Sequence, residues 1–248
     1  MQEKQISLTI VVPAFNEENN LALACRGIFS IATLYFENYE VLIIDDASKD
    51  KTWEVAQQLA QENKRVRAFR NERNMGLGFN YFFGVDQACC QYVMLIPGDN
   101  EVSAESMPGI FSTVGQSDIV VAHIANPRVR PLSRQITSRL FTHSMNLLFG
   151  QRLHYYNGIN VIRTDLVRKC QRLTNGFAYM AATLTLLLNA GHSYASAGFL
   201  VKKRVFGKTK AFRIHNILSV ARTILLLWRQ IHLRARRGSR FTVSSNQI

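Results

Sequence analysis

Two carboxylates one residue apart follow an apolar run in the first half of the sequence. The run Tyr92–Ile96 leads into a Pro-Gly turn that carries Asp99 and Glu101. A strand that is apolar throughout is typical of a sheet covered on both faces, and ligands of such sheets bind beyond the carboxyl ends of the strands. Because Mg²⁺ prefers one or two carboxylates plus substrate phosphates, the stretch indicates a divalent-metal site. An ordinary polar turn after a strand would give the same pattern.

Polar and acidic residues also follow two earlier apolar runs. They are Asn16 and Glu17, after the run at 7–12, and Asp45 and Asp46, after the run at 39–44. The carboxyl ends of parallel strands meet at one edge of a sheet. We therefore expect three acidic turns to converge on one site.

The elements that position these turns alternate between strand and helix. Such alternation indicates an α/β fold with a parallel, doubly wound sheet and right-handed crossovers. Strands are predicted at 7–12, 39–44, 66–70, 92–96, 118–124, within 155–162 and at 194–206. Helices are predicted at 18–33, 53–60, 79–90, 104–115, 133–149, from Thr164 or Asp165, and at 177–190.

Residues 213–237 form one long candidate helix. Apolar residues recur at i, i+3, i+4 and i+7, which is the pattern of an amphipathic helix, and arginines line much of the remainder. The apolar stripe either packs on the domain or on a second copy, or it lies in a membrane interface, where Trp, Leu and Arg are the expected mixture. We assign 213–239 to this helix and 240–248 to a disordered tail.

The charge is divided unevenly along the chain. The net charge is +13, but residues 1–100 hold 9 Lys/Arg against 13 Asp/Glu, whereas residues 101–248 hold 21 against 4. The second part therefore suits an anionic partner, such as phosphate groups or an anionic membrane, unless it is simply a soluble basic surface. Because no nucleic-acid-binding motif is present, nucleic acid is not expected as a partner.

The N-terminal sequence lacks the features of a signal peptide. No apolar run has the roughly 18 residues that a membrane span needs. We therefore expect a cytoplasmic protein that lies peripherally on the membrane face.

Four stretches together resemble family 2 glycosyltransferases of the GT-A fold, particularly the branch of dolichol-phosphate mannose synthase and other polyprenyl-phosphate sugar transferases. The resemblance covers about residues 7–230. The stretches are 11–19 (VVPAFNEEN), 41–48 (VLIIDDAS), 74–78 (NMGLG) and 204–210 (RVFGKTK). The resemblance implies a Rossmann-like, doubly wound mixed sheet with a nucleotide-sugar half at 1–101 and an acceptor half at 102–212.

The resemblance also implies which residues bind the donor. A GDP- or UDP-sugar would be held by Pro13, Ala14, Asn16, Glu17, Asp45, Asp46 and Gly76. The Asp-x-Asp motif of the family falls on Pro97-Gly98-Asp99, so its first Asp is replaced by Pro97. Asp99 and Glu101 would then be the catalytic pair and the ligands of Mg²⁺ or Mn²⁺.

Basic residues of the second half correspond to phosphate-binding positions of the family. Arginine suits bidentate phosphate recognition and lysine acts as a point charge. The residues that would bind the phosphates of the acceptor or donor are Arg134, Arg139, Arg204, Lys208 and Lys210.

The helix position at which family members commonly carry an acidic base is Ala182. Transfer to a hydroxyl needs a base, whereas a phosphate oxygen is already ionised near neutral pH. The absence of a carboxylate at this position thus favours a polyprenyl-phosphate acceptor, and the resemblance implies that the transfer inverts the anomeric centre. Two alternatives stay open. One is transfer to a hydroxyl of a glycan or lipid, with Asp99, Glu101 or Asp165 as base; the other is a catalytically degenerate member that binds a membrane or a partner. A homo-oligomer is compatible with each.

Overall fold

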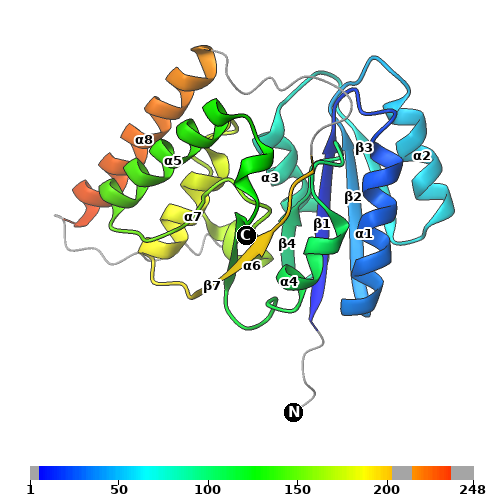
Figure 1. Cartoon of the computed structure of the whole chain (residues 1–248), viewed down its shortest axis with the longest axis horizontal. Coiled ribbons are helices and arrows are strands. Elements are labelled where there is room, and N and C mark those ends of the chain that lie inside the picture. The colour runs from blue at the N-terminus through cyan, green and yellow to red at the C-terminus, as the bar shows by residue number, and fades with distance from the viewer. Residues whose placement is uncertain (1–5, 203–213, 236–248) are drawn as a thin grey trace, which may run out of the picture.

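A seven-stranded sheet separates two layers of helices (Figure 1). The computed structural model describes residues 6–202 and 214–235, with side chains of the last helix described for residues 219–232. The strand order is β3-β2-β1-β4-β6-β5-β7. The strands are β1 (Ser7–Ala14), β2 (Asn38–Asp45), β3 (Val66–Arg70), β4 (Tyr92–Leu95), β5 (Ile119–Ile124), β6 (Val161–Arg163) and β7 (Tyr194–Phe199).

The first four strands are parallel, as the sequence predicts. β1 pairs with both β2 and β4, and β2 pairs with β3. The prediction of a wholly parallel sheet is wrong at β6, which runs antiparallel to its neighbours β4 and β5; the mixed sheet implied by the family resemblance is confirmed. Because β5 and β7 again run parallel to each other, the carboxyl ends of every strand except β6 lie at one edge.

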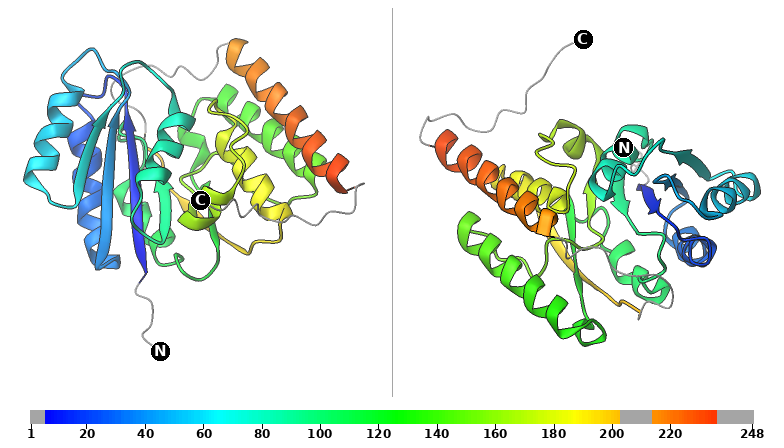
Figure 2. Two further views of the ribbon diagram at one scale, coloured as in Figure 1. Left: turned by 180° about the vertical axis from the view of Figure 1, so that it is seen from behind. Right: turned by 90° about the horizontal axis from the view of Figure 1, so that it is seen from above.

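Helices cover both faces of the sheet, so its strands are buried on both sides (Figure 2). One face is covered by α1 (Leu21–Tyr35), α2 (Thr52–Glu62) and α4 (Met107–Phe111). The other is covered by α3 (Leu77–Gln87), α5 (Leu132–Phe149), α6 (Thr164–Lys169), α7 (Tyr179–Asn189) and α8 (Ile214–Ala235). Alternation of side chains along β1 serves both layers, since Ile10 packs with the first group and Val11 with the second.

Most helix boundaries differ from the sequence prediction by one to three residues, and two elements differ more. The helix expected at 104–115 is a short 3-10 turn, Ala104–Ser106, followed by the five-residue α4. The strand expected at 194–206 ends at Phe199, and Val201 then forms an isolated bridge with Val102.

The helix α8 packs on the domain with only part of the stripe expected from the sequence: Ile224 and Ile231 of that stripe are partly buried against the core. Its buried side chains are Thr223 and Leu227, whereas Leu225 and Trp228 are exposed. The difference arises because the helix is apolar on two sides, and spacing alone does not tell which side meets the domain. Within the described ranges, no helix has the length and hydropathy needed to cross a membrane.

Candidate functional site

The turns that follow β1, β2 and β4 are hydrogen-bonded to one another. The backbone N–H of Gly98 donates to the carbonyl of Pro13 at 3.0 Å, and that of Asp46 donates to the carbonyl of Ala14 at 2.8 Å. The first turn is also joined to the second by the N–H of Asn16, which donates to Ser48 Oγ at 2.9 Å. The structure therefore brings the three acidic turns together at the carboxyl edge, as expected.

Each of these turns contains a residue with left-handed backbone. The φ angles are 57° at Asn16, 60° at Ala47 and 57° at Asn100, and these are the positive-φ residues other than glycine among the described ones. Asparagine adopts this conformation readily, but for alanine it costs about 1–2 kcal/mol. Such strain concentrates at functional sites, where the surrounding structure holds the loop in place.

Asp46 fixes the start of α3. Its Oδ1 accepts from the N–H of Met75 and from Asn71 Nδ2, both at 2.8 Å, and its Oδ2 accepts from the N–H of Gly76 at 2.9 Å. Gly76 has a φ of 86°, a conformation that favours glycine. Two expected donor-binding residues, Asp46 and Gly76, are therefore bonded to each other, and Asp46 has a clear structural role.

Asp45 is fully buried beside a small cavity. Its Oδ1 accepts from the N–H of Ser48 at 3.1 Å, and its Oδ2 lies 3.0 Å from Arg70 Nε without hydrogen-bond geometry. This buried oxygen therefore keeps capacity for a further donor. The adjacent cavity has a volume of about 430 Å³ and is lined by Ala47, Ser48, Arg70, Asn71 and Glu72.

Glu17 lies beneath the first turn and is buried. Its Oε2 accepts from Asn20 Nδ2 at 2.7 Å, and its backbone N–H donates to Thr52 Oγ1 at 2.8 Å. Glu17 thus links the start of α1, through its carboxylate, to the start of α2, through its backbone.

Asp99 and Glu101 lie in the turn after β4 and are half-buried. The N–H of Glu101 donates to Asp99 Oδ1 at 3.1 Å, and Glu101 Oε2 lies 3.9 Å from Arg134 Nη1. The carbonyl of Glu101 accepts from the N–H of Lys202 at 2.7 Å. The first turn of α5 and the chain after β7 therefore both contact the turn that carries the two carboxylates.

Not every predicted phosphate-binding residue is at this edge. Arg139 is exposed and, at 100° per residue, lies about 140° round α5 from Arg134, so the helix directs it away from Glu101. The remaining three, Arg204, Lys208 and Lys210, lie outside the described residues.

The carboxylate pair is a sparse donor set for a metal. In the part of the chain that the structure describes, no three His, Cys, Asp or Glu side chains are grouped so that they could hold an ion. Glu101 already faces the positive charge of Arg134. Asp99 fits a hard divalent cation if the phosphates of a bound donor complete the coordination, because Mg²⁺ sites commonly combine one or two carboxylates with substrate phosphates.

His123, at the end of β5, lies at the same edge. Its Nδ1 is 3.2 Å from Ser196 Oγ, and its ring centroid is 5.2 Å from that of His154. Burial, and then the charge of His154, lower the pKa of His123 below its usual value, which favours the neutral imidazole.

Two further residues of the edge were not predicted as site residues from the sequence. They are Ser48, which follows β2, and Arg70, which ends β3, and only these positions in the sequence could have indicated them.

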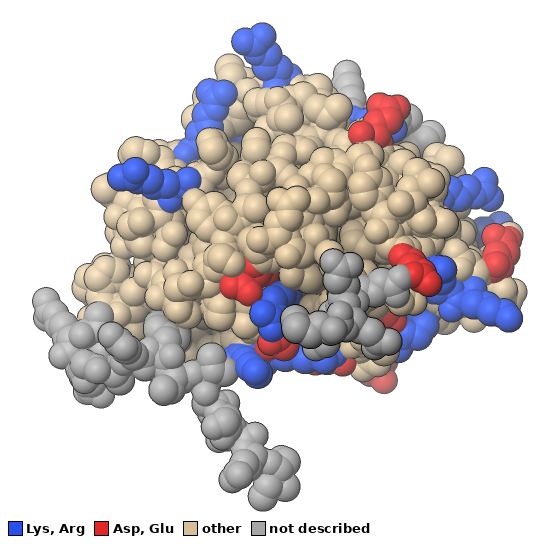
Figure 3. Space-filling view, turned by 90° about the horizontal axis from the view of Figure 1, so that it is seen from below, with Lys and Arg blue, Asp and Glu red and all other residues tan. Residues whose placement is uncertain are grey.

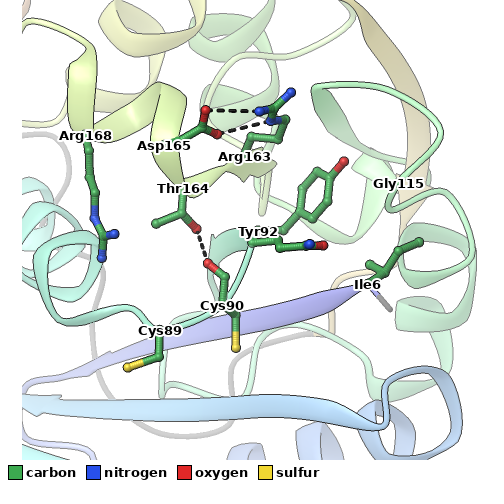
Figure 4. Close-up of a pocket in the computed structure, with 10 residues that line it drawn as sticks. Ile6, Cys89, Cys90, Tyr92, Gly115, Arg163, Thr164, Asp165 and Arg168 are labelled. Atoms are coloured by element: carbon green, nitrogen blue, oxygen red, sulfur yellow. Dashed lines mark hydrogen bonds and ion pairs between the residues drawn. The ribbon is translucent and has the colours of Figure 1, made fainter. Parts of the chain in front are cut away.

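A second, larger cavity lies at the opposite edge of the sheet and does not contain the acidic turns. Its volume is about 710 Å³, and its lining includes Cys90, Arg163, Asp165 and Arg168 (Figure 4). Arg163 is paired with Asp165 at 3.0 Å, and Arg168 donates to backbone carbonyls. Seen from below, charges of both signs lie side by side on this face (Figure 3). Because Asp165 is at this edge, it is remote from Asp99, and the hypothesis that it is the base is wrong.

Comparison with known proteins now identifies the family. The family profile described as "Glycosyl transferase family 2" matches residues 9–171, which include the three acidic turns and α5. The chain belongs to glycosyl transferase family 2. The resemblance drawn from the sequence is therefore confirmed.

Two relatives of this family 2 chain act on polyprenyl phosphates according to their names. The dodecaprenyl-phosphate galacturonate synthase of Rhizobium johnstonii is 23% identical over 67% of this chain and 50% of its own. The undecaprenyl-phosphate 4-deoxy-4-formamido-L-arabinose transferase of Photorhabdus laumondii is 26% identical over 62% and 47%. The chain thus spans about half the length of these relatives.

Solved structures confirm the GT-A fold. Glucosyl-3-phosphoglycerate synthase from Mycobacterium tuberculosis, in complex with Mn²⁺, UDP and phosphoglyceric acid, has a TM-score of 0.66 at 14% identity, over 92% of this chain and 78% of its own. TarS from S. aureus with UDP-GlcNAc has a TM-score of 0.61 at 15% identity, over 95% and 74%. At these identities the likeness concerns the fold alone.

Proposed function

We propose that this family 2 chain is an inverting glycosyltransferase that moves a sugar from a GDP- or UDP-sugar to a polyprenyl phosphate. The observation that carries the proposal is the hydrogen-bonded junction of the three acidic turns at one edge of the sheet. A junction of this kind holds several acceptors at fixed positions, which suits the ribose, base and diphosphate of one nucleotide.

The donor side follows from the groups at this junction. The buried Asp45 and the cavity beside Ser48 and Arg70 suit a nucleobase or ribose, since a carboxylate oxygen accepts from N–H or hydroxyl groups. Asp99, together with the diphosphate, would hold Mg²⁺ or Mn²⁺. The bound ion would stabilise the charge on the departing nucleoside diphosphate.

The acceptor side follows from what the second half offers. Ala182 is buried in α7 among apolar residues, so the helix presents no base at that position, and an acceptor phosphate needs none. Arg134, beside Glu101, is the cation at the edge for the acceptor phosphate. Arg204 follows Lys202 by two residues in the sequence, and Lys202 contacts the Glu101 turn. The names of the two relatives agree with a lipid-phosphate acceptor.

A second candidate is transfer to a hydroxyl. His123 favours it, because its lowered pKa keeps a neutral imidazole available as a base at the same edge. Glu101, paired with Arg134, is the weaker candidate for that role. In either case the acceptor enters on the side of α5 and β5.

The proposal places the protein peripherally on the cytoplasmic face of a membrane, where a polyprenyl phosphate is found. A homo-oligomer is compatible with it but contributes no residue to the proposed chemistry.

The test is release of nucleoside diphosphate from a panel of GDP- and UDP-sugars in the presence of Mn²⁺. Release that depends on added polyprenyl phosphate is the expected result. Release that depends instead on a hydroxyl acceptor, and is lost in His123→Gln, supports the second candidate. If the protein neither releases nucleoside diphosphate nor binds a nucleotide, the proposal is contradicted. The chain would then be a non-catalytic family member.

A further inference from the structure

We propose that α5 and α8 together form one docking surface for an anionic lipid bilayer. The two helices run side by side on the outer side of the second helix layer (Figures 1 and 2). They touch near their C-terminal ends, where the ring of Phe149 lies 6.4 Å from that of His232. The inference goes beyond the sequence expectation, which considered only the last helix.

A stripe of large aliphatic side chains is exposed along the full length of α5. Leu132, Ile136, Leu140 and Leu147 are exposed by 68%, 56%, 66% and 77%. Their spacings of 4, 4 and 7 residues place them within an arc of about 80° on the helix. Single exposed leucines need no explanation, but four large aliphatic side chains on one side of a helix, interrupted by exposed His143, indicate an interaction surface.

The helix α8 also exposes apolar side chains. Leu225 and Trp228 are exposed by 57% and 41%, although Leu227 on the opposite side of the helix is buried against the domain. Trp228 has an amphipathic ring, which suits the level of lipid headgroups. α8 is therefore held on the domain by one apolar face and offers a second one to a partner.

Charge decides which partner fits. Neither α5 nor α8 contains an acidic residue, and residues 166–248 hold 15 Lys/Arg and no Asp/Glu. Exposed Arg139 borders the stripe of α5, and exposed Arg222 and Arg229 border that of α8. Apolar side chains flanked by arginines suit an interface with anionic lipid. A second copy would bring two strongly cationic faces together, which is unfavourable.

The location of the surface is consistent with the candidate site. The first turn of α5 carries both Leu132, at one end of the stripe, and Arg134, beside Glu101. A bilayer against α5 therefore lies next to the edge at which an acceptor phosphate would bind.

The surface is tested with the full chain and vesicles of phosphatidylglycerol and phosphatidylcholine, without donor or acceptor. The variant Ile136→Ser/Leu140→Ser/Leu147→Ser removes the stripe, and Leu23→Ser/Leu34→Ser on α1 is the matched control, because these leucines are exposed by 55% and 75% on the other helix layer. We expect the first variant to co-sediment with vesicles at least about tenfold more weakly, and the control to bind as the wild type does.

Two further measurements sharpen the test. Arg222→Gln/Arg229→Gln should weaken binding by about fivefold per arginine. Because the chain has two tryptophans, Trp53→Phe leaves Trp228 as reporter, and its emission should be quenched by lipids brominated in the acyl chains.

Unchanged sedimentation of the stripe variant would overturn the inference. So would equal binding of the wild type to vesicles of phosphatidylcholine alone, or a dimer that the stripe variant dissociates without vesicle binding. Because nucleotide-sugar turnover is not measured here, failure of this inference is separate from failure of the proposed transferase function.

Discussion

The N–H of Gly98 donates to the carbonyl of Pro13 at 3.0 Å, and this bond joins the turn of the proposed metal ligand to the turn of the proposed nucleotide site. A Cβ at Gly98 would lie 3.1 Å from Leu21 Cδ1 and 3.3 Å from both Ala14 Cβ and the Pro13 carbonyl oxygen. The close approach therefore leaves little room for a side chain. It also holds the turn through its backbone, in addition to the hydrogen bond from the N–H of Glu101 to Asp99 Oδ1.

Asp99→Asn should remove turnover and leave the fold intact. The amide keeps the size of the side chain but loses the charge that binds a divalent cation, and we expect turnover with Mn²⁺ to fall by about 100-fold or more. Asp165→Asn, at the opposite edge of the sheet, is the control and should turn over as the wild type does. Full activity of Asp99→Asn would remove this residue from the site.

Arg134 and Arg139 should differ although they are five residues apart on one helix. Arg134 lies beside Glu101, whereas Arg139 is exposed on another side of α5. Loss of a hydrogen bond to a charged group costs about 1.5–3 kcal/mol, so Arg134→Gln should lower kcat/KM for the acceptor by about 10- to 100-fold. Arg139→Gln should change it much less. Equal losses would show that the edge is not where the acceptor phosphate binds.

Asp46→Asn should lower the thermal stability. The amide nitrogen would replace an acceptor of the N–H groups of Met75 or Gly76, and an unsatisfied buried group costs about 1–3 kcal/mol. We expect a fall in Tm of about 2–4 °C per kcal/mol, measured by circular dichroism. Glu62→Gln, an exposed residue of α2, is the control. An unchanged Tm would contradict the structural role of Asp46.

Stability should depend on pH through His123. Its pKa is lowered in the folded protein, so the unfolded chain binds the proton more readily, and stability is lost as the pH falls through the ordinary histidine pKa of about 6.5. His123→Gln should flatten the dependence of Tm on pH between pH 7 and 5. His143→Gln, exposed on α5, should leave it unchanged; a slope unaltered by His123→Gln would contradict this account.

Local sequence patterns were sufficient for much of the fold. The apolar runs before Asn16, Asp45 and Pro97 predict three of the parallel strands, and polarity at their ends predicts the shared edge. β6 was harder to predict, because three residues between α5 and α6 carry no periodicity that reveals their direction. The packing face of α8 was predicted only in part for a related reason: the helix has apolar residues on two sides, and packing around Leu227 buries Ile224 and Ile231 but leaves Leu225 and Trp228 exposed.

The residues of the candidate site also differ in whether the sequence predicts them. Asp45, Asp46 and Asp99 were found because acidic residues at strand ends form a repeated signal. Arg70 and His123 were not assigned to the site, because each is an isolated polar residue until the sheet brings it to the edge. The angle between Arg134 and Arg139 follows from their spacing, but which of them faces Glu101 depends on the rotation of α5, which tertiary packing fixes.

The central claim is that the turns after β1, β2 and β4 bind one nucleotide, and amide hydrogen exchange with and without UDP or GDP in the presence of Mn²⁺ tests it most directly. The account predicts slower exchange on nucleotide binding in residues 13–17, 45–48 and 97–101, with no change around Cys90 and Asp165 at the opposite edge. Protection confined to that opposite edge, or binding without protection of any of the three turns, would contradict it.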